Sequence, residues 1–450
     1  MNSILVPLFT LIGLLAVIFF HADYYFPVWL SVMLMSIVTL ALIKSNRRNQ
    51  LGVLTLLLWL VYALPFIHIP PYIWFDFSTN PILLWGLSVN PYMVDERVIR
   101  LTAMIGAVGA LGFSVGALSN RMIIRHDIGN NANGGKRVFQ TLDITIWLVW
   151  IALGILFTAL SAPEETVFMA TYTESGSALE KANFSSAWML SYVILSFAFS
   201  DTLLEQKPST KRLKKIIMVA SVVLVVVYYQ LLRGDRESMP WVFGLALAYY
   251  YWAAGVTQRQ EFVIPWLRFL WISLSLLITT MIIGAVRSEL SGAALSDLSD
   301  ILVALYESDM VGLANILKGT WSAVLLTPLS VAGDHIYGLL QTKYGTDYLD
   351  LLLSTIPGFL ADAIGYVRPI DGNHGPAWEM RYGIGGTHAT VVPFMNFGMM
   401  GVFLITAIWA RLIASFEKII LPRLSVTGLS FLITMAMASP HWLWYGEKNG

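Results

Sequence analysis

The chain has 450 residues, of which 57% are hydrophobic and 12% charged, and its formal net charge is zero. This apolar content and the mean hydropathy of +0.68 exceed what soluble domains carry, at roughly 45–50% apolar residues, and indicate a membrane protein. Zero net charge argues against nucleic acid as a partner. The absence of cysteine excludes disulfides, thiolate metal sites and cysteine nucleophiles.

Long uncharged runs recur along the chain, and a helix needs about 20 mostly apolar residues to cross a bilayer core. The first run, SILVPLFTLIGLLAVIFF, lacks a basic n-region and a small-residue cleavage site, so we expect a first span rather than a removed signal peptide. The predicted fold is an all-α polytopic membrane protein with about 11 transmembrane helices, or 12–14 if shorter apolar segments also cross. The predicted spans are 3–20, 26–43, 51–67, 98–118, 144–160, 185–203, 216–232, 239–254, 264–285, 391–410 and 424–440.

The basic loops predict the orientation of these spans. The loops KSNRRNQ, NRMIIRHDIGNNANGGKRVFQ and EQKPSTKRLKK all fall on one face when the N-terminus is placed inside, and basic loops favour the cytoplasm. The opposite, outer face then receives a long segment between the ninth and tenth spans. The predicted organisation is an N-terminal bundle over 1–285, a large outer loop over 286–390 and C-terminal helices over 391–450.

A short charged turn, LLRGDRESMPW, separates two apolar runs on the outer face. It holds Arg233, Asp235, Arg236 and Glu237 within five residues. The turn presents two arginines, three positions apart, at the membrane border. Taken alone, it is also typical of a salt-bridged turn that keeps its charges in water.

The long outer segment changes character along its length. Its first part, LSDLSDILVALYESDMVGLANILKG, predicts an amphipathic helix that packs on the protein's own spans. The segments 311–333 and 349–366 are too short or too interrupted by Pro and Gly to be assigned as spans. From 368 to 401 the chain is rich in Gly and Pro, and this stretch runs directly into a span, which favours a ligand site. Its polar side chains include Arg368, Asp371, His374, Glu379, Arg381 and His388.

Several common catalytic motifs are missing from the sequence. It contains no GxxxxGK[ST] phosphate loop, no HExxH metal motif and no GxSxG nucleophile elbow. The remaining candidates are arginines on the predicted outer face, because a guanidinium binds phosphate through two parallel hydrogen bonds. Such a cluster suits a lipid-linked phosphate or pyrophosphate, although any one arginine is equally typical of a snorkelling border residue. The candidate diphosphate ligands are Arg233, Arg236, Arg287, Arg368 and Arg381.

With these features the chain resembles the Wzy-type polymerases of oligosaccharide repeat units, which act on O-antigen and enterobacterial common antigen. The resemblance covers residues 216–412. It includes the Gly-Asp-Arg turn, the stretch STIPGFLADAIGYVRP, and a His-bearing, Gly-rich segment that enters the next span at FMNFGMMGVFL. The end of the chain, MASPHWLWYGEKNG, departs from the family, which often has another helix there. The resemblance implies a GT-C-like membrane fold.

The resemblance also implies an activity at the periplasmic face of the bacterial inner membrane. There, a sugar hydroxyl of one undecaprenyl-diphosphate-linked oligosaccharide would attack the anomeric carbon of another, and undecaprenyl diphosphate would leave. Arg236, Arg233 and Arg287 would bind the diphosphate. His388 and His374 are candidates for a base or a second diphosphate contact, whereas Asp235 and Glu237 would orient the arginines or act as a base. No cofactor or metal is expected, and membrane lipids and a chain-length regulator protein are further candidate partners.

Two alternatives stay open. An O-antigen ligase would use the same donor with a lipid A core acceptor. A transporter or flippase would bind the diphosphate without chemistry, although the predicted spans carry almost no ionisable residues at mid-membrane.

Overall fold

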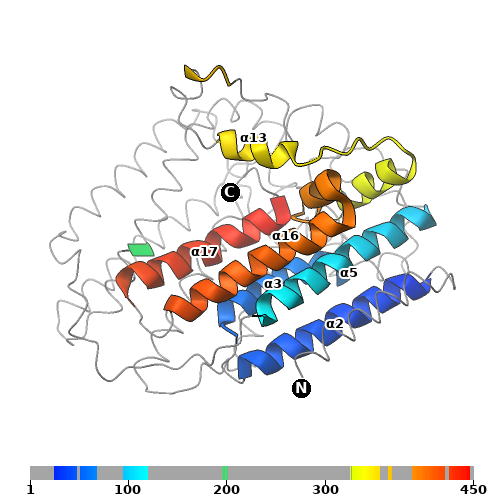
Figure 1. Ribbon diagram of the computed structural model, residues 1–450. Coiled ribbons are helices and arrows are strands. Elements are labelled where there is room, and N and C mark those ends of the chain that lie inside the picture. Colours follow the sequence, from blue (N-terminus) through cyan, green and yellow to red (C-terminus); the bar gives the residue numbers. More distant parts are fainter. Residues whose placement is uncertain are drawn as a thin grey trace, which may run out of the picture. The chain divides into compact units, whose positions relative to one another are not determined.

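The computed structural model describes residues 25–47, 51–67, 95–119, 196–197, 200, 325, 327–354, 363–366, 388–420 and 425–445. Every regular element among these residues is helical (Figure 1), which confirms the all-α prediction for this part of the chain. The elements are α2 (Tyr25–Arg47), α3 (Val53–Ile67), α5 (Glu96–Leu118), α13 (Thr346–Ser354), α16 (Val391–Ile420) and α17 (Val426–Tyr445), and residues 327–336 are also helical.

The boundaries of α2, α3 and α5 lie close to the predicted spans 26–43, 51–67 and 98–118. Among the described helices, α5 and α16 are long and apolar enough to cross a membrane, a property that core helices of soluble proteins can share. These two are fewer than the eleven spans predicted. Outside the described residues lie the predicted spans 3–20, 144–160, 216–232, 239–254 and 264–285, and all but three residues of 185–203.

The chain divides into two compact units that do not follow the three sequence regions predicted above. One unit comprises Met1–Ile123, Trp321–Phe416 and Ser439–Gly450, and the other comprises Ile124–Thr320 and Glu417–Ala438. The first unit therefore joins early helices to the end of the predicted outer loop and to the start of α16. All the interactions described below belong to this first unit.

In this unit α2 packs against α3 and α5, and α3 packs against α5. The Ser31 hydroxyl of α2 donates to the Ala103 carbonyl of α5 over 3.1 Å, and the Trp59 indole of α3 donates to Thr39 of α2 over 2.8 Å. Small side chains and interhelical hydrogen bonds of this kind hold helices together when the hydrophobic effect between them is weak.

Glycines of α5 let its backbone approach α16 closely. A Cβ on Gly112 would lie 2.3 Å from the Phe403 carbonyl oxygen, and one on Gly116 would lie 2.0 Å from the Ala407 carbonyl oxygen. Both neighbours are backbone atoms of α16, so a side chain at either position has no flexible group to displace. The absence of Cβ at these two positions therefore sets the spacing between α5 and α16.

The chain reverses direction within α16. Gly398 has φ 61° and ψ −150°, which are not helical and favour glycine. A Cβ on Gly401 would lie 2.4 Å from the Pro393 carbonyl oxygen, although eight residues of one straight helix would span about 12 Å. The predicted span 391–410 is thus two helical pieces: a short arm, Val391–Phe397, and a longer piece that continues to Ile420 (Figure 1).

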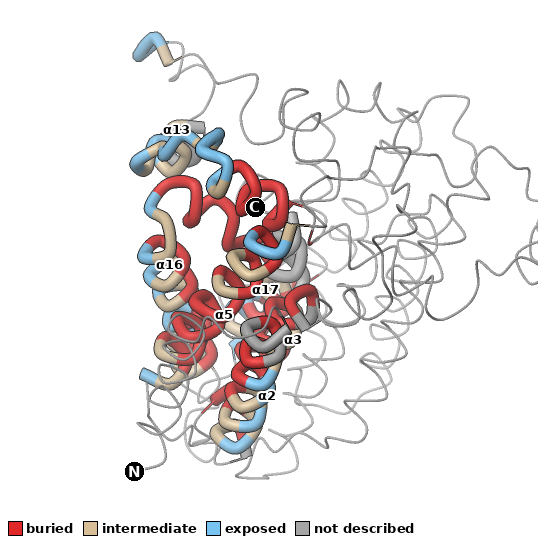
Figure 2. The backbone as a smooth tube through the Cα atoms, turned by 90° about the vertical axis from the view of Figure 1, so that its right-hand side faces the viewer, coloured by how far each residue is buried: buried red, intermediate tan, exposed pale blue. Residues whose placement is uncertain are grey.

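The short arm lies inside the protein. Every residue from 388 to 396 is buried, and exposed side chains return only at Phe397. Residues 327–334, within the segment 311–333 left unassigned above, are likewise helical and buried. By contrast, α13 carries mainly exposed and half-buried residues where its side chains are described (Figure 2).

Candidate functional site

Of the candidate site residues predicted from the sequence, the structure describes only His388. The other candidates lie outside the described residues, so their mutual distances stay predictions: Arg233, Asp235, Arg236, Glu237, Arg287, Arg368, His374 and Arg381.

His388 lies at the buried end of the short arm, three residues before α16 begins. Its side chain is fully buried, and its ring meets the rings of Tyr62 and Phe66 of α3 edge to face, with centroids 5.2 and 4.9 Å away. The Phe66 ring also lies against Gly106 of α5. Gly106 follows the start of α5 by ten residues, or about 15 Å of helix. The described end of the Gly-rich segment, at His388, therefore lies well inside the helix bundle.

The hydrogen bonds of His388 are local. The backbone N–H of Thr390 donates to Nδ1 over 3.3 Å, and the Thr390 hydroxyl oxygen lies 3.0 Å from the same atom. No described residue makes a hydrogen bond of normal geometry with Nε2. Because a buried imidazolium without a charged partner is costly, the ring is neutral in this arrangement. A neutral ring supplies no positive charge to a diphosphate.

A polar network fixes the opposite end of the short arm. The buried amide of Asn396 accepts from the Gly345 N–H over 2.8 Å and donates to the Asp347 carboxylate over 2.8 Å. Lys343 pairs with the same carboxylate at 2.9 Å. The amide donors and acceptor of Asn396 are thus satisfied where burial makes an unmet polar group costly. Asn396 was not among the residues predicted from the sequence, although a lone Asn in FMNFGMMG was an available signal.

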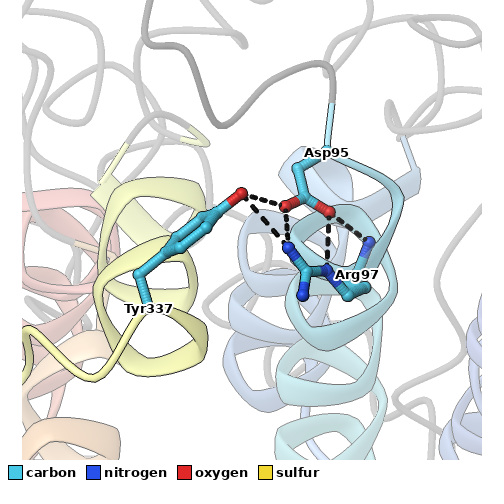
Figure 3. A network of polar contacts seen from close by, with 3 residues as sticks. All are labelled: Asp95, Arg97 and Tyr337. Carbon is cyan, nitrogen blue, oxygen red and sulfur yellow. Dashed lines mark hydrogen bonds and ion pairs between the residues drawn. The ribbon is translucent and has the colours of Figure 1, made fainter.

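A second polar network ties the start of α5 to the turn at Tyr337 (Figure 3). Asp95 is the N-cap of α5 and accepts the Arg97 backbone N–H over 2.9 Å. The Arg97 side chain donates to both carboxylate oxygens of Asp95, and the Tyr337 hydroxyl donates to one of them. These contacts, led by the Arg97 side-chain hydrogen bonds, hold the pKa of Asp95 well below its usual value. The hydrogen bond to Asp95 raises the pKa of Tyr337.

No family model, curated protein or solved structure matches the chain. The site must therefore be judged from its own chemistry. The described part holds a neutral histidine at one end of a buried arm and two neutralised ion-pair networks on other segments. This arrangement holds the short arm of α16 at both of its ends.

Proposed function

We propose that the chain is a multi-pass protein of the bacterial inner membrane that polymerises undecaprenyl-diphosphate-linked oligosaccharide repeat units at the periplasmic face. In the proposed step, an acceptor sugar hydroxyl attacks the anomeric carbon of the donor glycan. The bond from that carbon to the diphosphate oxygen breaks, undecaprenyl diphosphate leaves, and the hydroxyl proton passes to a base. The reaction needs no metal in this proposal, because arginine side chains stabilise the charge that develops on the leaving group.

Membrane insertion is supported by an apolar stripe on α16. Its side chains are four residues apart, so each lies next to the following one in a continuous stripe along the helix, and they are 39–66% exposed. The stripe extends over about 24 Å at 1.5 Å per residue, which approaches the thickness of a bilayer core. Contact with lipid tails would remove these apolar side chains from water. The stripe consists of Met400, Leu404, Ile408, Leu412 and Phe416.

The observation that carries the proposal is the buried short arm of α16. Backbone that breaks and reverses at membrane depth is tolerated where it is enclosed by protein or lines a wet cavity, and this one reverses at Gly398. It is also the direct continuation of the Gly-rich segment that holds Arg368, His374 and Arg381. A buried and structured start of α16 supports a substrate site at the end of the outer loop, next to the periplasmic face.

Within this proposal, Arg236, Arg233 and Arg287 bind the donor diphosphate, and Arg368 and Arg381 bind from the outer loop. A base for the acceptor hydroxyl would be His374, because His titrates near neutral pH. Asp235 and Glu237 would orient the two arginines of the turn, and either could also take the proton.

The proposal is tested by Arg236→Ala and Arg233→Lys in protein purified in detergent and given the lipid-linked repeat unit. Both variants should insert normally and lose polymer formation, because lysine cannot reproduce the bidentate contact. Arg259→Ala, on the predicted cytoplasmic side, is the matched control and should retain it. Polymer of normal length from Arg236→Ala would reject the assignment. Transfer only to a lipid A core would instead indicate a ligase.

A further inference from the structure

One ring nitrogen of His388 has a defined hydrogen-bonding partner. The backbone N–H of Thr390 donates to Nδ1 over 3.3 Å, and no described residue makes a hydrogen bond with Nε2. A backbone N–H can only donate, so Nδ1 accepts with its lone pair, and a neutral imidazole then carries its proton on the other nitrogen. The contact with Thr390 therefore favours the tautomer with the proton on Nε2 and the lone pair on Nδ1.

This tautomer restricts what the ring can do. A neutral imidazole has one lone pair with which to accept a proton, and in His388 the Thr390 N–H occupies it. The ring itself packs edge to face against Tyr62 and Phe66 of α3. To act as a base, the ring would have to give up its contact with Thr390, the residue that immediately precedes α16.

Thr390 and its neighbours also show what the ring holds in place. The N–H of Ala389 donates to the Leu443 carbonyl of α17 over 2.8 Å. The buried end of the short arm is thus held on one side by α17 and on the other by the contacts of His388 with α3, while Asn396 holds the opposite end. Both ends of the arm are therefore fixed to neighbouring segments.

We propose that His388 is a positioning residue, a neutral Nε2–H imidazole that joins α3 to the start of the short arm of α16, and not the base of the transfer reaction. The inference rests on the proposed function for its activity readout. The tautomer itself does not depend on that function.

The tautomer can be measured in the folded, full-length protein by ¹⁵N NMR after labelling its histidines. The His388 signals are assigned as those that disappear in His388→Gln. We expect Nε2 to carry the proton and Nδ1 to be unprotonated. A proton on Nδ1, or on both nitrogens, at neutral pH would overturn the inference, whatever reaction the protein performs.

The role can be measured from the rate of polymer formation as a function of pH. Glutamine can keep an N–H donor near the position of Nε2 but cannot titrate, so we expect His388→Gln to lose less than about tenfold in rate, with the wild-type pH profile retained. Removal of a general base would instead cost about 10²- to 10⁴-fold and remove the acid limb of the profile. That second result, in a variant with the wild-type unfolding midpoint, would overturn the inference.

The two proposals fail in different ways. Wild-type protein that forms no polymer from lipid-linked repeat units rejects the proposed function, and the NMR result then decides the tautomer alone. Wild-type protein that forms polymer, while His388→Gln behaves as a lost base, rejects only the positioning role.

Discussion

The hydroxyl of Tyr62 donates a hydrogen bond of 2.9 Å to the backbone carbonyl of Gly106, so that α3 and α5 are joined at the level of His388. A Cβ on the next glycine of this face, Gly109, would lie 2.1 Å from the same hydroxyl oxygen. We expect Gly109→Ala to destabilise the protein by about 1–3 kcal/mol through overpacking. The thermal unfolding midpoint in detergent measures this.

The double variant separates this clash from a general effect of alanine. Removal of the hydroxyl in Tyr62→Phe loses one hydrogen bond but also makes room for the new Cβ. The combined loss in Gly109→Ala with Tyr62→Phe should therefore be smaller than the sum of the single losses. If the stability lost in the double variant equals the sum of the two single losses, the predicted clash between a Cβ at Gly109 and the Tyr62 hydroxyl is wrong.

Asn396 should control the opening of the turn at Gly345. Asn396→Ala leaves the Gly345 N–H without its acceptor, and an unmet donor costs about 1–3 kcal/mol when buried. We expect faster amide hydrogen exchange over residues 343–348, measured by mass spectrometry. Thr406→Val is the matched control, because the Thr406 hydroxyl donates to carbonyls of α16 itself. Equal exchange in the wild type and in Asn396→Ala would contradict the network.

Asp95 should contribute a pH-dependent part of the stability. Its pKa is lower in the folded protein than in the unfolded chain, so the folded state prefers the carboxylate. This contribution is fully present above the unfolded pKa of about 3.9 and is lost as the pH falls through the folded value. Between about pH 5 and pH 2, the unfolding midpoint of the wild type should fall more steeply than that of Asp95→Asn. Parallel curves for the two proteins would contradict the assignment.

The apolar stripe of α16 should face lipid. The chain has no cysteine, so Ile408→Cys can be spin-labelled as a single site in protein reconstituted into vesicles. We expect the label to be accessible to molecular oxygen and shielded from a water-soluble relaxation agent, as lipid-exposed positions are. Leu349→Cys on exposed α13 is the aqueous control. Equal access of the aqueous agent at both positions would argue against a membrane-facing stripe.

The sequence was sufficient to predict the positions of α2, α3, α5 and α17, because they are long apolar runs, but it left α13 and the helix at 327–336 unassigned. Glu96 and the cap at Asp95 begin α5 two residues before the predicted start at 98. The reversal at Gly398 was not predicted. The helical pieces on both sides of it are apolar, so a hydropathy profile shows one continuous span. Gly398 itself, with Pro393 and Gly401 in the same stretch, was the available signal.

The environment of His388 was equally hard to predict. Its neighbours in the sequence are Gly-rich and polar, which favoured a ligand site in a loop at the start of a span. Its burial depends instead on Tyr62 and Phe66, more than 300 positions earlier, whose rings enclose it. Contacts between segments so far apart are not encoded in local composition. The roles of Arg233 and Arg236 stay predictions from the sequence, because both residues lie outside the described part of the chain.

Product formation by the purified wild-type protein tests the central proposal most directly. The protein is incubated with one undecaprenyl-diphosphate-linked repeat unit, without metal or nucleotide, and the products are separated by size. We predict a ladder of lipid-linked polymers together with released undecaprenyl diphosphate, one molecule for each bond formed. Unchanged substrate in the presence of folded protein would contradict the proposed function.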